Sequence, residues 1–260
     1  MDTVAIPAPI LHSRLGSAAS PLVLDVRSES RFEALPRMVP GALRPHADIV
    51  AFGTRHADGH AIVVYCAAGH DVSREAVRAL GRAGFDAALL EGGLEAWIRA
   101  GFATVRARPE WRVPGGSRWI TRARPKIDRI ACPWLLRRLI DPLARIDYVP
   151  ADRVLDEARA RQAVAFDLPG APVTHRGERC SFDALLEDFD LHDAPLDRLA
   201  RIVRGADTGR MDLAPECAGL LAASQGFSEC YRDDGEMLAA AMPLYDALYA
   251  WCRRAAQGAV

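Results

Sequence analysis

The sequence predicts an α/β domain with a parallel sheet, followed by a mostly helical α+β domain. In the first hundred residues, short apolar runs alternate with helix-patterned segments, the order typical of a parallel α/β sheet. Beyond that point most segments have helical spacing, and the two strand-like runs are each stopped by proline. The length of 260 residues suits two domains. We assign residues 1–104 to the first domain, 105–118 to a linker and 119–260 to the second domain.

Local patterns predict the elements of the first domain. LVLDV (22–26) and IVVYC (62–66) are β-branched apolar runs, as expected of strands buried on both faces. SREAVRALGRAG has apolar residues at helical spacing and predicts a helix closed by Gly84. AALLEGG (87–93) predicts another strand, and LEAWIRAG predicts a helix closed by Gly101.

The linker and the second domain differ from the first domain in composition and in hydrophobic periodicity. Residues 105–118 contain two prolines, adjacent glycines and four arginines without periodicity, which indicates a linker. CPWLLRRLI predicts a helix with Pro133 in its first turn. ARIDYVP and AVAFDLP predict short strands, whereas APLDRLARIVRGAD, APECAGLLAASQG and GEMLAAAMPLYDALYAWCRRAAQ predict helices. Pro243 is expected to kink or interrupt the last helix.

Composition and charge restrict the class of protein. The net charge of −1 gives no general reason to expect nucleic acid or an anionic membrane as a partner. No run approaches the roughly 18 consecutive apolar residues of a membrane span, and the N-terminal residues lack a signal-peptide pattern. The six cysteines show no CxxC spacing, which argues against a zinc ribbon or a disulfide framework. We therefore expect a reduced, cytoplasmic protein.

Cys66 stands where a predicted strand meets a predicted helix. The residues of this loop are Cys66, Ala67, Ala68, Gly69, His70, Asp71, Val72 and Ser73. A strand, a glycine-containing turn and a helix in this order direct backbone N–H groups and a helix N-terminus at the thiol. Such surroundings lower the pKa of a cysteine and hold an anionic sulfur species or an oxyanion. The alternative interpretation is a buried structural cysteine at a strand end.

Four successive motifs, LVLDVRSESRF, VPGALRPHADI, VVYCAAGHDVSREAVRALGRAGF and LLEGGLEAWIRAG, resemble the rhodanese homology domain in order and spacing. The resemblance implies an α/β rhodanese-like parallel sheet domain. It also implies that Cys66 is the catalytic residue that carries a persulfide, that Asp25 and Arg27 are structural, and that Trp97 belongs to the core. Sulfur transfer of this kind requires no cofactor. Its partners are a small sulfur donor or a protein persulfide, and a thiol acceptor.

The loop departs from the common rhodanese pattern C-x-x-G-x-R-S. Asp71 stands at the arginine position, and Val72 is inserted before Ser73, which gives a loop of seven residues from Cys66 to Val72. Related phosphatases and arsenate reductases use this length and end the loop in arginine. A carboxylate that points into the loop repels anionic donors such as thiosulfate, whereas a protonated His70 partly compensates. These departures favour a protein persulfide over thiosulfate as the sulfur donor.

Polar residues of the second domain supply candidates for a second site. The only lysine, Lys126, stands about one helical turn from Arg129, so both can face one anion. A mixed N/O ligand set for iron, manganese or zinc consists of Asp128, His175, Glu178 and Asp207. Cys180 lies close to this set, with Ser181 as an N-cap candidate. The alternative interpretation is structural, with these residues as ion pairs and helix caps, because no local spacing here is as specific as HExxH.

The segments WITRARPKIDRIACPWLLRRLIDP, FDLPG, THRGERCSFD, IVRGADT, YRDD and YDALYAWCR resemble the C-terminal domain of the chromate resistance protein ChrB family. The resemblance spans residues 118–256. Its motifs contain Cys132 and the candidate residues of the second site: Lys126, Asp128, Arg129, His175, Glu178, Cys180 and Asp207. It implies a link to chromate resistance or its regulation, with chromate or another oxyanion as a partner.

The sequence therefore predicts a rhodanese-like sulfurtransferase coupled to a chromate-resistance domain that binds a metal or an oxyanion. The alternative is a non-catalytic sensor of chromate or oxidative stress in which the rhodanese module is degenerate. Asp71 favours this alternative, whereas Cys66 and Gly69 oppose it. Direct reduction of an oxyanion is a third interpretation, which the missing loop arginine disfavours.

Overall fold

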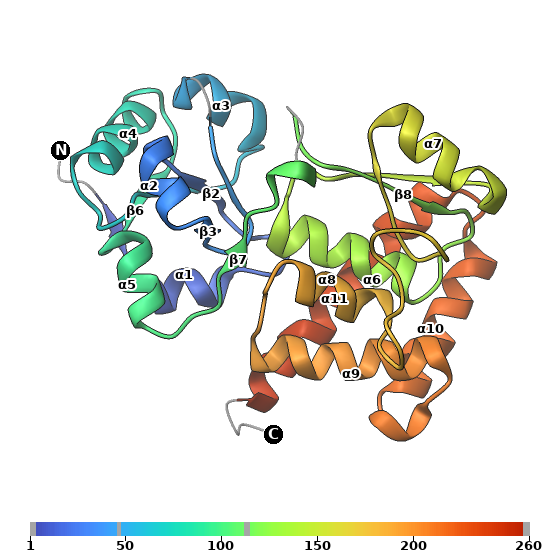
Figure 1. The fold of residues 1–260 in the computed structure, drawn as a ribbon. Coiled ribbons are helices and arrows are strands. Elements are labelled where there is room, and N and C mark those ends of the chain that lie inside the picture. The colour runs from blue at the N-terminus through green and yellow to red at the C-terminus, as the bar shows by residue number, and fades with distance from the viewer. Residues whose placement is uncertain (1–3, 46–47, 112–114, 257–260) are drawn as a thin grey trace. The chain divides into compact units, whose positions relative to one another are not determined.

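A computed structural model describes residues 4–45, 48–111 and 115–256 (Figure 1). The chain folds into two compact units. The first contains the residues up to Ala107 together with Arg138–Pro142, and the second contains Arg108–Arg137 and the residues from Leu143 onward. Residues 112–114 of the predicted linker, and residue 257 of the predicted last helix, lie outside the described residues. None of the described helices combines the length and the hydrophobicity that a membrane crossing requires.

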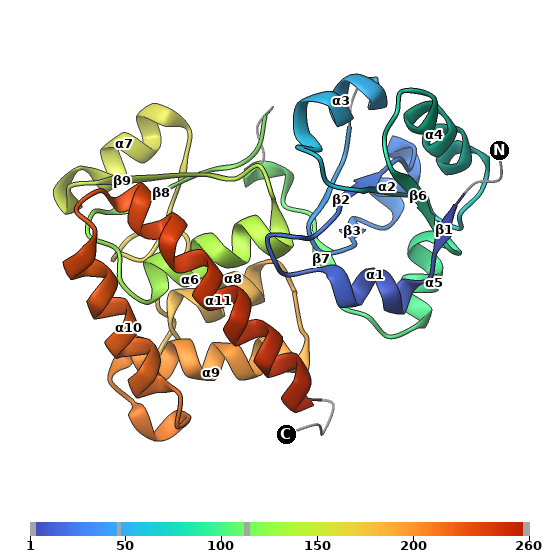
Figure 2. The ribbon, with the colours of Figure 1, turned by 180° about the vertical axis from the view of Figure 1, so that it is seen from behind.

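The first unit is an α/β structure. In chain order its elements are β1 (Ala5–Ile6), α1 (Ala8–Arg14), β2 (Leu22–Asp25), α2 (Glu29–Ala34), β3 (Arg37–Met38), β4 (Ala42–Leu43), α3 (Ile49–His56), β5 (Ile62–Tyr65), α4 (Asp71–Arg82), β6 (Ala87–Leu90), α5 (Gly93–Arg99) and β7 (Val105–Arg106). Within the described residues, a parallel five-stranded sheet has the order β1-β6-β5-β2-β4. Helices α3 and α4 lie on one face of this sheet, and α1 and α5 lie on the other (Figures 1 and 2).

Helices on both faces explain why the central strands are apolar except for Asp25, which ends β2. Leu24, Ile62 and Val64 are fully buried, as expected for parallel strands covered from both sides. The strands predicted at 22–26 and 62–66 are confirmed as β2 and β5. The predicted helices are confirmed as α4 and α5, although α4 begins at Asp71, two residues before the predicted start.

Regular structure reaches into the segment predicted as a linker. Val105–Arg106 forms β7, which pairs antiparallel with Arg37–Met38, and burial of the Val105 side chain accounts for this pairing. At the other end, Arg118 already belongs to the next sheet. The connection between the regular elements is therefore shorter than residues 105–118.

The second unit is mostly helical, as predicted. In chain order it contains a 3-10 helix (Pro109–Trp111), β8 (Arg118–Arg122), α6 (Asp128–Leu135), β9 (Arg145–Val149), a 3-10 helix (Ala151–Arg153), α7 (Val154–Arg161), β10 (Val164–Ala165), α8 (Ser181–Asp188), α9 (Ala194–Thr208), a 3-10 helix (Met211–Leu213), α10 (Cys217–Cys230) and α11 (Asp234–Ala256). Its described strands form a parallel sheet in the order β10-β8-β9. Helix α6 is packed among α8, α9 and α11, and α11 also packs against α10 (Figure 2).

Two prolines behave differently from the prediction. Helix α6 begins at Asp128, so Pro133 lies in its interior and not in its first turn. A proline at this position cannot donate to the carbonyl of Arg129, and the hydroxyl of Tyr148 donates to that carbonyl instead, at 2.8 Å. At Pro243, where a kink or an interruption was expected, the helix is not interrupted, because α11 continues through this residue while it packs against α9 and α10.

Candidate functional site

Cys66 directly follows β5, at the carboxyl end of the first sheet, where parallel α/β structures bind their ligands. The residue is buried, with 8% of its surface exposed. The Sγ atom accepts a hydrogen bond from the Ser73 hydroxyl at 3.1 Å and one from the His70 backbone N–H at 3.3 Å. The thiol therefore lies in a cradle of donors formed by the loop and the first turn of α4.

Opposing effects set the pKa of the Cys66 thiol. Burial raises this pKa, whereas hydrogen bonds from the Ser73 hydroxyl and from the backbone N–H groups of His70, Ala68 and Gly69 lower it. The hydrogen bonds outweigh burial, so the pKa lies below its ordinary value. The thiolate is the nucleophilic form of cysteine, and a lowered pKa increases its fraction near neutral pH.

The start of α5 holds the cysteine loop in place. The N–H groups of Leu94 and Glu95 donate to the carbonyls of Cys66 and Ala67 at 3.0 and 2.9 Å. Gly93 makes this approach feasible, because its φ is +59° and a Cβ atom there would lie 2.4 Å from the Cys66 carbonyl oxygen. With these carbonyls bonded to α5, the loop N–H groups remain available to the sulfur.

The three loop residues before Ser73 face solvent. His70 and Asp71 are exposed, and 60% of the Val72 side chain is accessible. Asp71 is the first residue of α4. Solvent and salt therefore screen the repulsion between its carboxylate and an anion that approaches Cys66.

A second cluster surrounds His175 in the second unit. Its Nε2 atom lies 3.1 Å from Asp207 Oδ2, 3.5 Å from Asp128 Oδ2 and 3.6 Å from Asp167 Oδ1. Asp128 begins α6 after β8, and Asp167 follows β10, the parallel neighbour of β8. Asp207 comes from the last turn of α9. The cluster therefore forms at the carboxyl ends of two adjacent parallel strands.

Hydrogen bonds and ion pairs fix two carboxylates of the cluster. Ser181 donates its backbone N–H to Asp128 Oδ2 and its hydroxyl to Asp167 Oδ1. Arg122 and Arg129 both pair with Asp167 Oδ2, at 3.1 and 3.3 Å. Among the described residues, the buried Asp128 Oδ1 atom has no hydrogen-bond partner.

The charges of the cluster shift two pKa values. A hydrogen bond with Asp128 raises the pKa of His175 to about 9 against the effect of burial. Burial and the neighbouring Asp128 and Asp167 raise the pKa of Asp207 to about 7. Arg122 and Arg129 balance the charge of Asp167, which leaves the carboxylates of Asp128 and Asp207 facing the single imidazole of His175.

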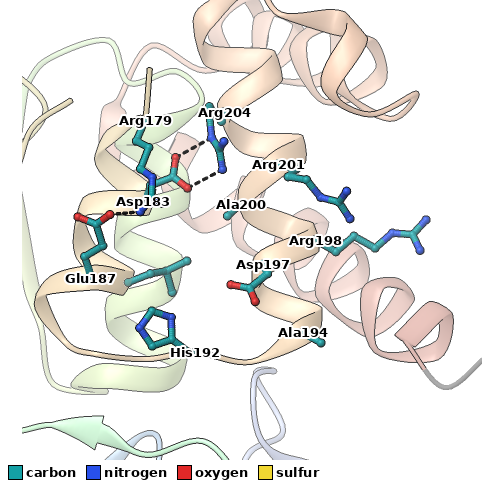
Figure 3. A pocket seen from close by; sticks show the side chains of 11 residues that line it. Arg179, Asp183, Glu187, His192, Ala194, Asp197, Arg198, Ala200, Arg201 and Arg204 are labelled. Carbon is teal, nitrogen blue, oxygen red and sulfur yellow. Dashed lines mark hydrogen bonds and ion pairs between the residues drawn. The ribbon is translucent and has the colours of Figure 1, made fainter. Parts of the chain in front are cut away.

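A separate pocket of about 520 Å³ lies along α9 (Figure 3). Figure 3 shows Arg204 facing Asp183, with which it forms two hydrogen bonds of 2.9 Å, and Arg179 facing Glu187. The carboxylates of Asp183 and Glu187 therefore neutralise two of the arginines that could otherwise bind an oxyanion in this pocket. Lys126 is exposed at the surface and does not line this pocket.

Comparison with known protein families identifies both units. Residues 119–252, just over half of the chain, match the family model of the ChrB C-terminal domain. The chain belongs to the ChrB C-terminal domain family. Residues 8–100 match the model of the rhodanese-like domain. The protein thus joins a rhodanese-like domain to a ChrB C-terminal domain.

Individual relatives cover parts of the chain. Protein ChrB of Cupriavidus metallidurans is 36% identical over 135 residues, which make up 52% of this chain and 40% of that protein. The chain therefore spans well under half of that relative. A rhodanese-like domain from Anabaena sp. is 33% identical and covers 45% of this chain and 88% of that chain, with a TM-score of 0.35. A rhodanese-related protein from Thermoplasma volcanium is 27% identical and covers 39% and 97%, with a TM-score of 0.30.

The ChrB C-terminal domain brings together three of the four predicted metal ligands, Asp128, His175 and Asp207. Glu178, the fourth, is exposed in the turn that follows His175 and lies outside this group. Asp167 joins the cluster and was missed by sequence reasoning. A usable signal was present, because Asp167 lies near the carboxyl end of the predicted strand AVAFDLP, and polar groups at the carboxyl ends of parallel strands converge.

The other candidates of the ChrB C-terminal domain have structural positions. Lys126 is exposed, and no described contact links it to the His175 cluster. The expectation that Lys126 and Arg129 face one anion stays a prediction. Cys132 and Cys180 are fully buried, and burial raises the pKa of both thiols, which keeps them protonated. The N-cap prediction for Ser181 is wrong, because Cys180 occupies the cap position and the Ser181 hydroxyl bonds Asp167.

In the rhodanese-like domain, Asp25 and Arg27 have the structural role that the resemblance implied. Both are buried. Arg27 donates to both carboxylate oxygens of Asp25 and to the carbonyls of Leu35 and Arg37, which ties the end of β2 to the following segments. Trp97 is fully buried in the core, as expected.

The lowered pKa of Cys66 predicts its reactivity with pH. A thiol reacts as thiolate, so alkylation of Cys66 by iodoacetamide should reach half its maximal rate below about pH 8.5, the value of an unperturbed cysteine. Ser73→Ala removes a hydrogen bond to Sγ worth about 1 kcal/mol. We expect the midpoint to move to higher pH and the rate near neutral pH to fall about fivefold. Peptide mass spectrometry measures this, with the exposed Cys230 as internal reference; an unchanged midpoint in Ser73→Ala contradicts the prediction.

Proposed function

We propose that this protein is a sulfurtransferase in which Cys66 carries sulfur as a persulfide, and that its ChrB C-terminal domain links this chemistry to chromate resistance. The supporting observation is the position of Cys66 Sγ, which accepts hydrogen bonds from Ser73 and His70 at the carboxyl end of the sheet. The rhodanese-like match over residues 8–100 supports the same conclusion. The proposal places the protein in the reducing cytoplasm, where Cys66 remains a thiol between turnovers.

The proposed reaction has two displacement steps. The Cys66 thiolate attacks the outer sulfur of the donor, so that a new S–S bond forms while the donor's bond to that sulfur breaks and its electron pair leaves with the donor. The loop N–H groups that now face Sγ stabilise the anionic persulfide. The thiolate of an acceptor then attacks the terminal sulfur, takes it as a new persulfide and returns Cys66 as thiolate.

The loop favours a persulfide donor over thiosulfate. Asp71 stands where the common rhodanese pattern has an arginine, so the loop lacks a fixed cation for a dianionic donor. The thiol cradle itself consists of backbone N–H groups and the Ser73 hydroxyl, which suit a singly charged sulfur. A small-molecule persulfide or a persulfidated protein is therefore the proposed donor, and a cellular thiol is the acceptor.

Steady-state sulfur transfer to a thiol acceptor tests this function. The donors to compare are glutathione persulfide, thiosulfate and 3-mercaptopyruvate. We expect turnover with the persulfide to exceed turnover with thiosulfate, Cys66→Ser to lose all turnover above the uncatalysed rate, and Cys230→Ser, an exposed-cysteine control, to retain it. Equal rates in the wild type and Cys66→Ser would contradict the proposal and leave the non-catalytic sensor as the function of the rhodanese-like domain.

A further inference from the structure

The His175 cluster has the composition and geometry of a metal site. We propose that the ChrB C-terminal domain of this chain binds a divalent transition-metal ion through Asp128, His175 and Asp207, with Asp167 as a positioning residue beside it. The ion belongs to the group of Mn²⁺, Fe²⁺ and Zn²⁺. This site is independent of the thiol chemistry at Cys66.

The distances between the ligand atoms fit a bound ion. One atom from each of Asp128, His175 and Asp207 lies within 4.8 Å of the others. Metal–ligand bonds of about 2.0–2.2 Å place neighbouring ligand atoms about 3–3.5 Å apart in octahedral or tetrahedral geometry. The His175 Nε2 atom is 3.1 Å from Asp207 Oδ2 and 3.5 Å from Asp128 Oδ2. An ion therefore fits among these atoms with little rearrangement.

An independent observation points to the same ion. Asp128 is fully buried, and its Oδ1 atom has no hydrogen-bond partner among the described residues. A buried carboxylate oxygen without a donor is strongly destabilising. The neighbouring Arg122 and Arg129 pair with Asp167 Oδ2 and make no described hydrogen bond to this atom. A divalent cation would satisfy the unpartnered oxygen and balance the charge of Asp128 and Asp207 together.

Hydrogen bonds and helix backbones around the proposed ligands fix their orientation, as is usual for metal sites. Ser181 bonds both Asp128 and Asp167, so one residue at the start of α8 orients two carboxylates. Asp128 and Asp207 belong to helices α6 and α9, which fixes their backbones. The side chain of His175 is 41% exposed, which leaves a path for the ion from solvent.

The ligand types select the class of metal. One imidazole with two carboxylates suits Mn²⁺, Fe²⁺ or Zn²⁺, whereas Mg²⁺ and Ca²⁺ prefer oxygen ligands alone. Soft metals such as Cu⁺ require thiolates. The neighbouring Cys132 and Cys180 do not belong to the group of converging ligand atoms.

Calorimetric titration of the full-length chain with Mn²⁺ and Zn²⁺, after treatment with a chelator, tests the site. We expect one equivalent of metal per chain in the wild type. His175→Ala and Asp207→Asn are each expected to weaken binding by at least about tenfold, and Asp128→Asn to do the same. The matched control is Glu178→Gln, which removes an acidic residue close in sequence but outside the cluster, and it should bind like the wild type.

Thermal unfolding supplies a second readout. Metal should raise the melting temperature of the wild type and of Glu178→Gln by the same amount, and should raise that of His175→Ala less, since stabilisation by a native-state ligand falls with its affinity. His175 is partly exposed, so this variant tests the site even if the buried Asp128→Asn fails to fold. Absence of saturable binding in the wild type, or equal affinity in His175→Ala, overturns the proposal. Because the readout is binding and not sulfur transfer, either result leaves the proposed function untouched.

Discussion

Gly93→Ala is expected to reduce persulfide formation at Cys66 at least tenfold and to destabilise the rhodanese-like domain by about 3 kcal/mol or more. A left-handed backbone conformation costs an alanine about 1–2 kcal/mol relative to glycine, and the φ of Gly93 is +59°. The added Cβ would also lie 2.4 Å from the Cys66 carbonyl oxygen and 2.7 Å from that of Ala67. Both contacts are with backbone, so relief requires displacement of the loop that carries the thiol.

Gly101→Ala is the matched control for this substitution. Gly101 follows the same helix, has a φ of +77° and has open space where a Cβ would lie. It therefore reports the cost of the backbone conformation without the clash, about 1–2 kcal/mol, and should keep wild-type sulfur loading. Urea unfolding and mass spectrometry of the loaded protein measure the two effects. Wild-type loading by Gly93→Ala would show that the approach of α5 does not position Cys66.

Asp25→Ala is expected to lower the free energy of unfolding of the rhodanese-like domain by about 3–5 kcal/mol, the typical effect of removing one partner of a buried ion pair. Asp25 accepts three side-chain hydrogen bonds from Arg27, and both side chains are almost fully buried. The substitution leaves the guanidinium of Arg27 buried beside an empty space. Hydrogen exchange of the amides of β2 and β5 reports the stability of this unit separately from the second.

Glu29→Gln is the matched control for the Asp25 substitution. Glu29 pairs with Arg44 at 2.9 Å, but its side chain is 65% exposed. Exposed ion pairs contribute about 0–1 kcal/mol, so this substitution should change the stability little. If the two substitutions destabilised the unit equally, burial of the Asp25–Arg27 pair would not be the source of its effect.

Patterns within single segments were enough to predict the central part of the rhodanese-like domain. The strands β2 and β5 are buried on both faces, so their apolar character is visible in the sequence without knowledge of their neighbours. Cys66 could be located for the same reason, since it directly follows β5. The two-residue strands β1 and β4 carry no such pattern, and only pairing with β6 and β2 defines them.

The cluster in the ChrB C-terminal domain depends on contacts between distant segments. Its residues come from α6, from the segment after β10, from the turn before α8 and from the end of α9. Sequence spacing could not show that Glu178 faces solvent. Asp167 could have been included only from its place near the end of a predicted strand. The position of Pro133 inside α6 could not be predicted from its own segment either. The hydroxyl that bonds the carbonyl of Arg129, which Pro133 leaves without a backbone donor, comes from Tyr148 in β9.

Intact-protein mass spectrometry after incubation with a persulfide donor tests the proposed role of Cys66 most directly. The comparison is between the wild type and Cys66→Ser, each treated with glutathione persulfide, thiosulfate and 3-mercaptopyruvate in turn. The account predicts that one sulfur atom adds to the wild type with the persulfide donor, that none adds to Cys66→Ser, and that an acceptor thiol removes it. Failure of every donor to load the wild type, or equal loading of Cys66→Ser, would contradict it.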